Sequence, residues 1–333
     1  MPNLNTTYLG LNLKNPIIAG SSGLTDSLSG IINLEKAGVA AVVLKSIFEE
    51  EIVAEMETNL KKMASERFIY PESLEFYENN EEENICEKYL ELIRSAKSNV
   101  KIPIIASINC VTADYWTYFP KQIEQAGADA LELNIFVLPS DLNRNREATE
   151  EVYFEIIEKV LEQVNITVSV KLSSYFSDLA LTLQKFAKTK IDGLVLFNKY
   201  FNPDFDINKM EVISGKLYSS PEEYYFPLRW ISIMSGRVDC SLAASTGIHD
   251  GEAVIKQILA GANAVQITST IYQNGMDQVQ KIIEYMQTWM NNKGYGNIED
   301  FRAKMSQKTS DNPAAYERVQ FMKYYRGHKP MGE

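Results

Sequence analysis

Apolar residues gather in eight short runs along the chain, and polar or amphipathic stretches separate them. Several of the intervening stretches have helical spacing, namely residues 27–38, 118–127, 148–163, 178–190 and 251–261. Strand and helix therefore alternate, which predicts parallel strands joined by crossover helices. The eight runs are PIIAG (16–20), VAAVVLKS (39–46), IPIIASIN (102–109), ADALELN (128–134), TVSVKLSS (167–174), DGLVLFN (192–198), CSLAAST (240–246) and NAVQITST (263–270).

Eight consecutive strand–helix units predict an α/β fold of the (β/α)8 barrel type, with a doubly wound sheet as the alternative. Three of the predicted helices end in Ala-Gly immediately before the next apolar run, at KAGVAAVV, QAGADALEL and LAGANAVQI. Glycine stops a helix there because it adopts the left-handed conformation without strain. We expect a single domain over residues 1–333, with a C-terminal extension from about residue 295.

Two segments interrupt the alternation. Residues 49–84 are rich in acidic side chains, which are typical of a solvated helix face or loop, and residues 202–227 carry several tyrosines and prolines. Long insertions in barrels usually lie among the loops that follow the strands, where ligands are enclosed. Both segments are therefore candidate lids.

Composition narrows the class of partner. The chain has 45% hydrophobic and 23% charged residues, as expected for a globular protein, and a net charge of −11 disfavours nucleic acid or an anionic membrane as a partner. The three cysteines are far apart, so neither a structural zinc site nor an iron–sulfur cluster is indicated. With no basic, apolar leader and no membrane-spanning run, the sequence predicts a cytoplasmic protein that acts on a small molecule.

Chemistry-bearing residues recur where the predicted strands end. In a barrel these ends meet at one mouth, so repeated amides, lysines and hydroxyls there indicate a shared site better than any one of them does alone. Singly, each is typical of turn capping or of a solvated surface. The set is Ala19, Gly20, Ser21, Lys45, Ser46, Asn109, Asn134, Lys171, Asn198, Thr246, Gly247, Thr268, Ser269 and Thr270.

The last two strands carry the most direct signal. STG (245–247) and TST (268–270) each stand before a helical stretch, so we expect both to open helices. Free backbone N–H groups and the positive ends of two helices would then converge on one point. This pattern favours a phosphate-binding site over two ordinary helix caps.

Over nearly its whole length the sequence resembles the dihydroorotate dehydrogenase family, including the flavin domain of dihydropyrimidine dehydrogenase. The order and spacing of the shared segments make the resemblance specific, although no single motif decides it. These segments are LGLNLKNPIIAGSSG (9–23), VVLKSI (42–47), IPIIASINCVTADYW (102–116), AGADALELN (126–134), SVKLSSYFSDL (169–179), GLVLFN (193–198) and STGIHDGEAVIKQILAGANAVQIT (245–268).

The resemblance implies an FMN oxidoreductase, with the phosphate at Thr246, Gly247, Ser269 and Thr270. Lys45 and Lys171 match family lysines near the flavin ring, where a cation stabilises the negative charge of the reduced flavin. Asn134 and Asn198 match family asparagines that contact flavin and substrate. Val137 or Leu138 stands where the family has its cysteine or serine base, and neither accepts a proton.

The substrate side departs as well, because residues 67–77 lack the asparagines with which the family holds its pyrimidine. We therefore expect a substrate other than dihydroorotate. Residues 135–138 (IFVL), with aromatic residues of both insertions, are expected to form an apolar wall of the pocket rather than a plain core plug. The candidates for proton transfer are Ser140, Lys199 and Tyr200.

Two other classes remain open at this point. One is a catalytically degenerate protein that binds FMN, and the other is a Schiff-base lyase built on Lys171 or Lys45. The polar C-terminal region after Gly294 covers the barrel or packs on a neighbouring subunit, so a homodimer is a further expectation.

Overall fold

The computed structural model describes residues 1–51, 85–110, 118–200 and 202–317. Eight parallel strands close into a barrel in chain order, because the last strand pairs with the first and β4 pairs with β6. All eight apolar runs form these strands, so the predicted barrel is confirmed. The strands are β3 (Ile17–Ala19), β4 (Ala41–Val43), β6 (Ile104–Cys110), β7 (Ala130–Ile135), β8 (Thr167–Leu172), β9 (Gly193–Leu196), β12 (Ser241–Ser245) and β13 (Ala264–Ile267).

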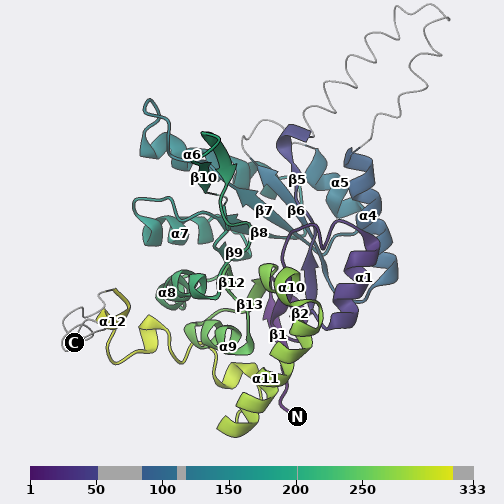
Figure 1. Cartoon of the computed structure of the whole chain (residues 1–333), viewed down its shortest axis with the longest axis vertical. Helices are drawn as coiled ribbons and strands as arrows, with labels where there is room; N and C mark the ends of the chain where they lie inside the picture. Colours follow the sequence, from purple (N-terminus) through teal and green to yellow (C-terminus); the bar gives the residue numbers. More distant parts are fainter. Residues whose placement is uncertain (52–84, 111–117, 201, 318–333) are drawn as a thin grey trace, which may run out of the picture.

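Helices surround the strands in the cartoon (Figure 1), so the outer face of the barrel is covered and most strand residues are buried. Gly38 and Gly261 follow α1 and α9 with φ angles of 108° and 121°, so these two helices end at Ala-Gly as predicted. The helices are α1 (Leu28–Ala37), α4 (Ile85–Asn99), α5 (Phe119–Gln125), α6 (Arg146–Leu161), α7 (Leu179–Ala187), α8 (Tyr225–Met234), α9 (Gly251–Ala260), α10 (Ser269–Asn274) and α11 (Asp277–Lys293).

A short N-terminal hairpin, β1 (Thr6–Tyr8) and β2 (Leu11–Leu13), packs into the barrel interior. Its buried Tyr8 and Leu9 form one apolar cluster with inward residues of the strands. Gly193 on β9 allows this packing, because a Cβ at that position would lie 2.4 Å from Leu9 Cδ2. The hairpin fills the interior from below, which leaves the carboxyl ends of the strands for a site.

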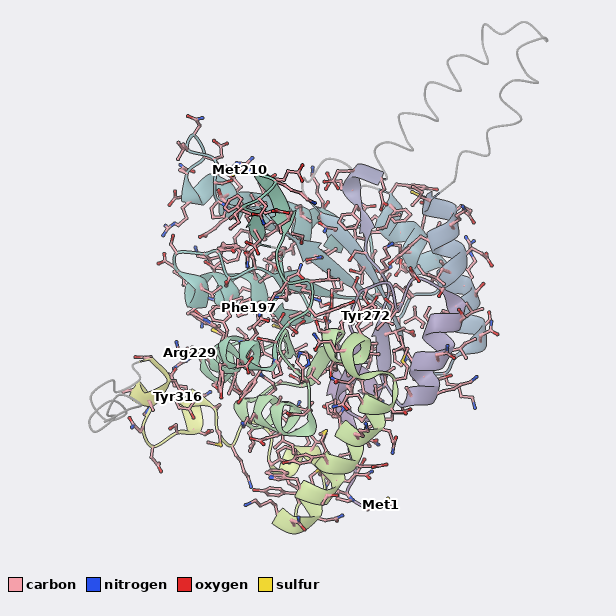
Figure 2. All side chains as sticks on the ribbon, in the orientation of Figure 1. Met1, Phe197, Met210, Arg229, Tyr272 and Tyr316 are labelled. Atoms are coloured by element: carbon pink, nitrogen blue, oxygen red, sulfur yellow. The ribbon has the colours of Figure 1, made fainter. Side chains whose placement is uncertain are left out.

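The insertion at residues 202–227 divides into two parts. Strands β10 (Pro203–Asp206) and β11 (Glu211–Ser214) form an antiparallel hairpin that stands away from the barrel, with Met210 near its outer end (Figure 2). The chain then returns and forms the short helix η2 (Pro221–Tyr224) before α8. A strand pair β5 (Ile47–Phe48) with β6 begins the other insertion, but residues 52–84 lie outside the described residues.

The C-terminal extension packs on the helices of its own barrel as far as residue 317. It contains η3 (Ile298–Asp300), η4 (Gln307–Thr309) and α12 (Ala314–Glu317). The backbone N–H groups of Ala303 and Met305 donate to Ile258 and Leu259 at the end of α9, over 3.0 and 2.8 Å. The predicted contact of this extension with the barrel is therefore found for residues up to 317. Among the described residues, no helix has the length and apolarity to cross a membrane.

Candidate functional site

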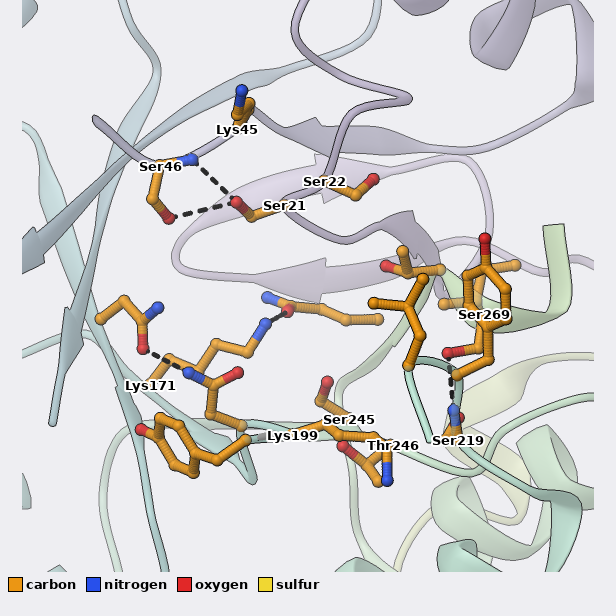
Figure 3. Close-up of a pocket in the computed structure, with 18 of the residues that line it drawn as sticks. Ser21, Ser22, Lys45, Ser46, Lys171, Lys199, Ser219, Ser245, Thr246 and Ser269 are labelled. Carbon is orange, nitrogen blue, oxygen red and sulfur yellow. Dashed lines mark hydrogen bonds between the residues drawn. The ribbon is translucent and has the colours of Figure 1, made fainter. Parts of the chain in front are cut away.

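A cavity of about 660 Å³ opens at the carboxyl ends of the barrel strands. Its volume lies within the range of about 300–1,000 Å³ that is usual for small-molecule and cofactor sites. Most of the predicted site residues converge on it (Figure 3), as the sequence pattern indicated. The predicted residues that line it are Ser21, Lys45, Ser46, Asn109, Asn134, Lys171, Asn198, Thr246, Gly247, Thr268 and Ser269.

Four predicted residues do not line the cavity. Ala19 is buried in the core, and the Thr270 hydroxyl is buried and donates to the carbonyl oxygen of His249 over 3.0 Å. Gly20 acts through its missing side chain, because a Cβ there would lie 2.7 Å from Thr268 Oγ1. Ser140 is exposed in the loop after β7, so it is not placed to transfer protons in the cavity.

Three neighbouring strands present a polar row along one side of the cavity. Asn109, Asn134 and Lys171 stand side by side, because Asn109 pairs in register with Asn134 and Asn134 pairs with Lys171. Asn198 Nδ2 at the end of β9 donates to Asn134 Oδ1 over 2.7 Å. The row offers amide donors and acceptors next to an ammonium, which suits a planar ring with alternating polar atoms.

The Lys171 ammonium is anchored at the floor of the cavity by residues that the sequence reasoning had not selected. Lys171 Nζ donates to Gln266 Oε1 over 2.8 Å and lies 3.7 Å from Glu132 Oε1. Gln266 Nε2 in turn donates to Glu132 Oε2. The sequence signal was present, since a lone amide and a lone acid interrupt the apolar runs of β13 and β7.

A second lysine borders the cavity from the end of β9. Lys199 Nζ contacts Glu223 Oε1 of η2 over 2.6 Å, and the pair joins the barrel to the insertion. Burial raises the pKa of Glu223, but Lys199 and the N–H of Ser220 outweigh it, so the pKa lies below its usual range. In Figure 3, Lys45 lies on the opposite side of the cavity from Lys199.

Only one of the two segments predicted to bind phosphate opens a helix. STG does not open a helix: α9 begins at Gly251 and is capped by the Asp250 side chain, which accepts from Ala253 N. TST does, since α10 begins at Ser269 after Thr268, whose side chain makes no cap hydrogen bond. The helix end that faces the cavity is therefore that of α10, while the STG turn contributes its hydroxyl and N–H groups.

Ser219, which the sequence reasoning missed, connects these two turns. Its hydroxyl accepts from Gly247 N over 3.2 Å and lies 3.2 Å from His249 Nε2, and its N–H donates to Ser269 Oγ over 3.0 Å. Burial lowers the pKa of His249. The insertion thus supplies a buried hydroxyl to the phosphate corner, the part of the cavity at Thr246, Gly247 and Ser269 where the phosphate was expected. This placement is visible only in the tertiary structure.

Of the four apolar residues after Asn134, only Phe136 lines the cavity. Ile135 is fully buried, Val137 packs on the core with its N–H donating to Tyr153 Oη over 3.0 Å, and Leu138 is 50% exposed. The expected four-residue wall is wrong in extent, because successive side chains leave the strand in different directions. Phe136 stacks on Tyr200, with ring centroids 3.7 Å apart and planes 23° apart.

Aromatic residues of the insertion line an adjoining cavity of about 360 Å³. This second cavity shares Asn198, Lys199, Tyr200 and Thr246 with the first. Tyr225 and Phe226 lie here and not around the main cavity, which corrects their predicted place. The predicted aromatics of residues 67–77 are outside the described residues. Among the residues described, no group of histidine, cysteine and acidic side chains could hold a metal ion.

The family model described as dihydroorotate dehydrogenase matches residues 3–290. The catalytic subunit of dihydroorotate dehydrogenase B (NAD(+)) from Thermoplasma acidophilum is 27% identical over 90% of this chain and 98% of its own length. The subunit of the same name from Methanocaldococcus jannaschii is 24% identical over 84% of this chain and 91% of its own length. Dihydropyrimidine dehydrogenase (NADP(+)), chloroplastic, from Arabidopsis thaliana is 22% identical over 90% and 76%.

Proposed function

Because the chain belongs to the dihydroorotate dehydrogenase family, we propose that it is an oxidoreductase that uses FMN to oxidise or reduce a CH–CH bond in a substrate other than dihydroorotate. When bound, FMN supplies a ring that accepts or donates hydride at N5. The single FMN site is the barrel cavity, and the whole chain forms one domain around it. The observation that carries the proposal is the convergence of the polar row and the aromatic stack on this one cavity.

The residues around the cavity fit this cofactor. Asn109, Asn134 and Lys171 offer hydrogen bonds and a positive charge to the ring. The hydroxyls of Thr268 and Ser269 at the start of α10 offer donors to the phosphate, which a helix N-terminus favours electrostatically. Gly20 fits as well, since the space beside Thr268 has no room for a Cβ.

The substrate would be flat and largely apolar. The Phe136–Tyr200 stack lies beside the Asn134–Asn198 pair, so an apolar face and two amides border the same part of the cavity. An apolar face gains from burying carbon surface, and the amides orient one polar edge of the ligand. Lys199, held by Glu223, is the group best placed to transfer a proton to or from such a substrate.

FMN binding is the first test. The purified protein should take up one FMN per chain, turn yellow and gain about 2.7 kcal/mol in stability at a hundredfold excess of FMN over its dissociation constant. Ser269→Asp places a carboxylate at the phosphate corner and should weaken FMN binding at least about tenfold, measured by fluorescence titration. Ser140→Asp makes the same change on an exposed loop outside the cavity and should leave binding unchanged.

Gly247→Asp is a poorer test of the same corner. Gly247 has a φ angle of 77°, and a Cβ would lie 2.1 Å from the backbone nitrogen of Tyr224. Any substitution there would disturb the docking of the insertion before its charge could act on a phosphate. A protein that stays colourless after reconstitution with FMN, with Ser269 intact, contradicts the proposal.

Substrate choice is the second test. Oxidation of dihydroorotate with a dye acceptor should be about 10²–10⁴-fold below that of an enzyme with a positioned base. In the reverse direction, flat, apolar compounds with a conjugated C=C bond should reoxidise the reduced flavin faster than orotate, the oxidised form of dihydroorotate, does. Flavin that no such compound and no hydride donor alters would instead indicate a degenerate FMN-binding protein.

The lyase alternative has its own readout. Lys171 Nζ is held by Gln266 and Glu132, whereas a Schiff base needs a free amine. Borohydride treatment in the presence of carbonyl compounds should therefore leave the mass of the protein unchanged. A stable adduct on Lys171 or Lys45 would overturn the oxidoreductase proposal.

A further inference from the structure

A polar layer lies inside the barrel directly below the cavity. Interiors of such barrels are usually filled by branched apolar side chains. Here Glu132 on β7 is fully buried, and its register partner on β8 is the buried Ser169. Tyr8 of the N-terminal hairpin is also fully buried, and burial together with the charge of Glu132 raises the pKa of its phenol. A buried carboxyl is costly unless other groups compensate it.

The hydrogen bonds of this layer run in one direction. An ammonium only donates, so Lys171 Nζ requires the oxygen of the Gln266 amide, and the Gln266 nitrogen must then point to Glu132 Oε2. Glu132 Oε1 has no hydrogen-bond partner within the described residues and lies 3.7 Å from Lys171 Nζ. The carboxyl is therefore the fixed end of a chain that holds the ammonium at the cavity floor.

We propose that Glu132 is a positioning and charge-balancing residue. It fixes the Lys171 ammonium through Gln266, and its negative charge weakens the electrostatic effect of that ammonium on a bound cofactor. The inference rests on the proposed FMN site. A reduced flavin carries more negative charge than the oxidised one, so a cation nearby favours reduction and an anion nearby opposes it. Glu132 then limits how strongly Lys171 favours the reduced form.

The charge of Glu132 depends on its surroundings. Burial raises the pKa of Glu132, and the Lys171 ammonium and the Gln266 amide offset this only in part. The other titratable groups that sense Glu132 are the phenols of Tyr8 and Tyr89, and burial raises the pKa of both, so they are neutral neighbours. Lys171 is thus the one charged group among these neighbours, and the balance is between two charges.

The redox potential of bound FMN tests the proposal. Glu132→Gln keeps the shape and removes the negative charge, so the preference of the site for reduced over oxidised FMN should rise by about tenfold. For a two-electron couple this equals a rise of about 30 mV in potential. Ser169→Ala is the matched control, because it removes an uncharged polar group from the same layer and should leave the potential unchanged.

The outcomes separate this inference from the proposed function. If wild-type protein binds no FMN, the proposed function fails. If wild type and Glu132→Gln both bind FMN with the same potential, Glu132 carries no balancing charge and this inference fails. A variant that only unfolds more easily, without a change of potential, shows a structural role and also contradicts it.

The pH dependence of the FMN potential gives a second test. Burial raises the pKa of Glu132, so protonation of this carboxyl as the pH falls should make the potential rise more steeply there in wild type than in Glu132→Gln. The measurement is a potential titration of both holoproteins over the same pH range. A steeper segment of equal size in both proteins has a source other than Glu132 and overturns the proposal.

Discussion

At the scale of single residues, the functional contrast is between lysines that look alike in the sequence. Lys171 is enclosed by Gln266 and Glu132, which fixes its nitrogen. Lys199 borders two cavities and has one carboxylate partner, Glu223 of the insertion, at 2.6 Å. The first is suited to steady electrostatic support and the second to exchanging a proton with a substrate.

Once a substrate is identified, Lys199→Met should lower its turnover by about 10²–10⁴-fold, because the proposed proton-transfer group is lost. FMN affinity should stay within about twofold, because the cofactor contacts remain. Stopped-flow kinetics of each half-reaction measure this. Lys256→Met is the control, since Lys256 pairs with Glu252 on α9 at the same 2.6 Å but does not line either cavity. Unchanged turnover in Lys199→Met would remove the residue from the mechanism.

Two buried tyrosines allow a comparison of how much a buried hydroxyl contributes to the free energy of unfolding with and without a hydrogen-bond partner. Within the described residues the Tyr8 hydroxyl has no hydrogen-bond partner, whereas Tyr153 Oη accepts from Val137 N. Tyr8→Phe should be neutral or stabilising by up to about 1 kcal/mol, and Tyr153→Phe should cost about 1 kcal/mol. Urea unfolding of the apoprotein measures both. A clear loss of stability in Tyr8→Phe would indicate that the hydroxyl does have a partner, either Ser169 or a buried water.

At the scale of elements, the insertion at residues 202–227 has one part that is exposed to solvent and one part that lines the cavity. Its hairpin β10–β11 exposes several large apolar side chains, Met210 among them at 87%, and within the described residues its two strands pair only with each other. The following residues turn inward, and Leu217, Tyr218 and Ser219 line the cavity. Local sequence could identify the insertion, but only the fold shows which half encloses the site.

Replacing residues 203–214 by two glycines should therefore leave FMN affinity and the melting temperature nearly unchanged. The base of the hairpin is already closed by a hydrogen bond from Gly215 N to Asn202 O over 2.8 Å, so a short link can span it. Thermal unfolding and FMN titration measure the outcome. A large loss of FMN affinity would instead assign the hairpin to the lid.

At the scale of the whole molecule, the described part of the chain shows a closed barrel on which an N-terminal hairpin and residues 295–317 pack. The N-terminal hairpin fills the interior, and the C-terminal extension lies on α8 and α9. Phe301 of the extension is fully buried and packs on Trp289 and Tyr295, with ring centroids 5.1 and 5.5 Å apart. The extension should therefore unfold together with the barrel.

Phe301→Ala should lower the free energy of unfolding by about 3–5 kcal/mol, because it leaves a cavity in a closely packed aromatic cluster. Calorimetry should show one transition shifted as a whole, rather than early melting of the extension alone. Met305→Ala, at an exposed position of the same extension, should change stability by less than about 0.5 kcal/mol. Two separate transitions in Phe301→Ala would contradict a single cooperative domain.

The sequence by itself determined the eight strands, the helices that end in Ala-Gly and the gathering of strand-end residues at one mouth. These features depend on near neighbours along the chain: apolar runs, glycine at a left-handed position, and the rule that parallel strands share their carboxyl edge. Asn109, Asn134 and Lys171 could be placed together for that reason before any contact was known.

Only the tertiary structure decided which side chains act on one another. Glu132 reaches Gln266 across 134 positions of sequence, Lys171 reaches Gln266 across 95, and Ser219 reaches Ser269 across 50. Phe136 faces the cavity while Val137 and Leu138 do not, because the path of the chain beyond the strand sets the direction of each side chain. Such choices depend on the packing of distant segments, which no local pattern of residues encodes.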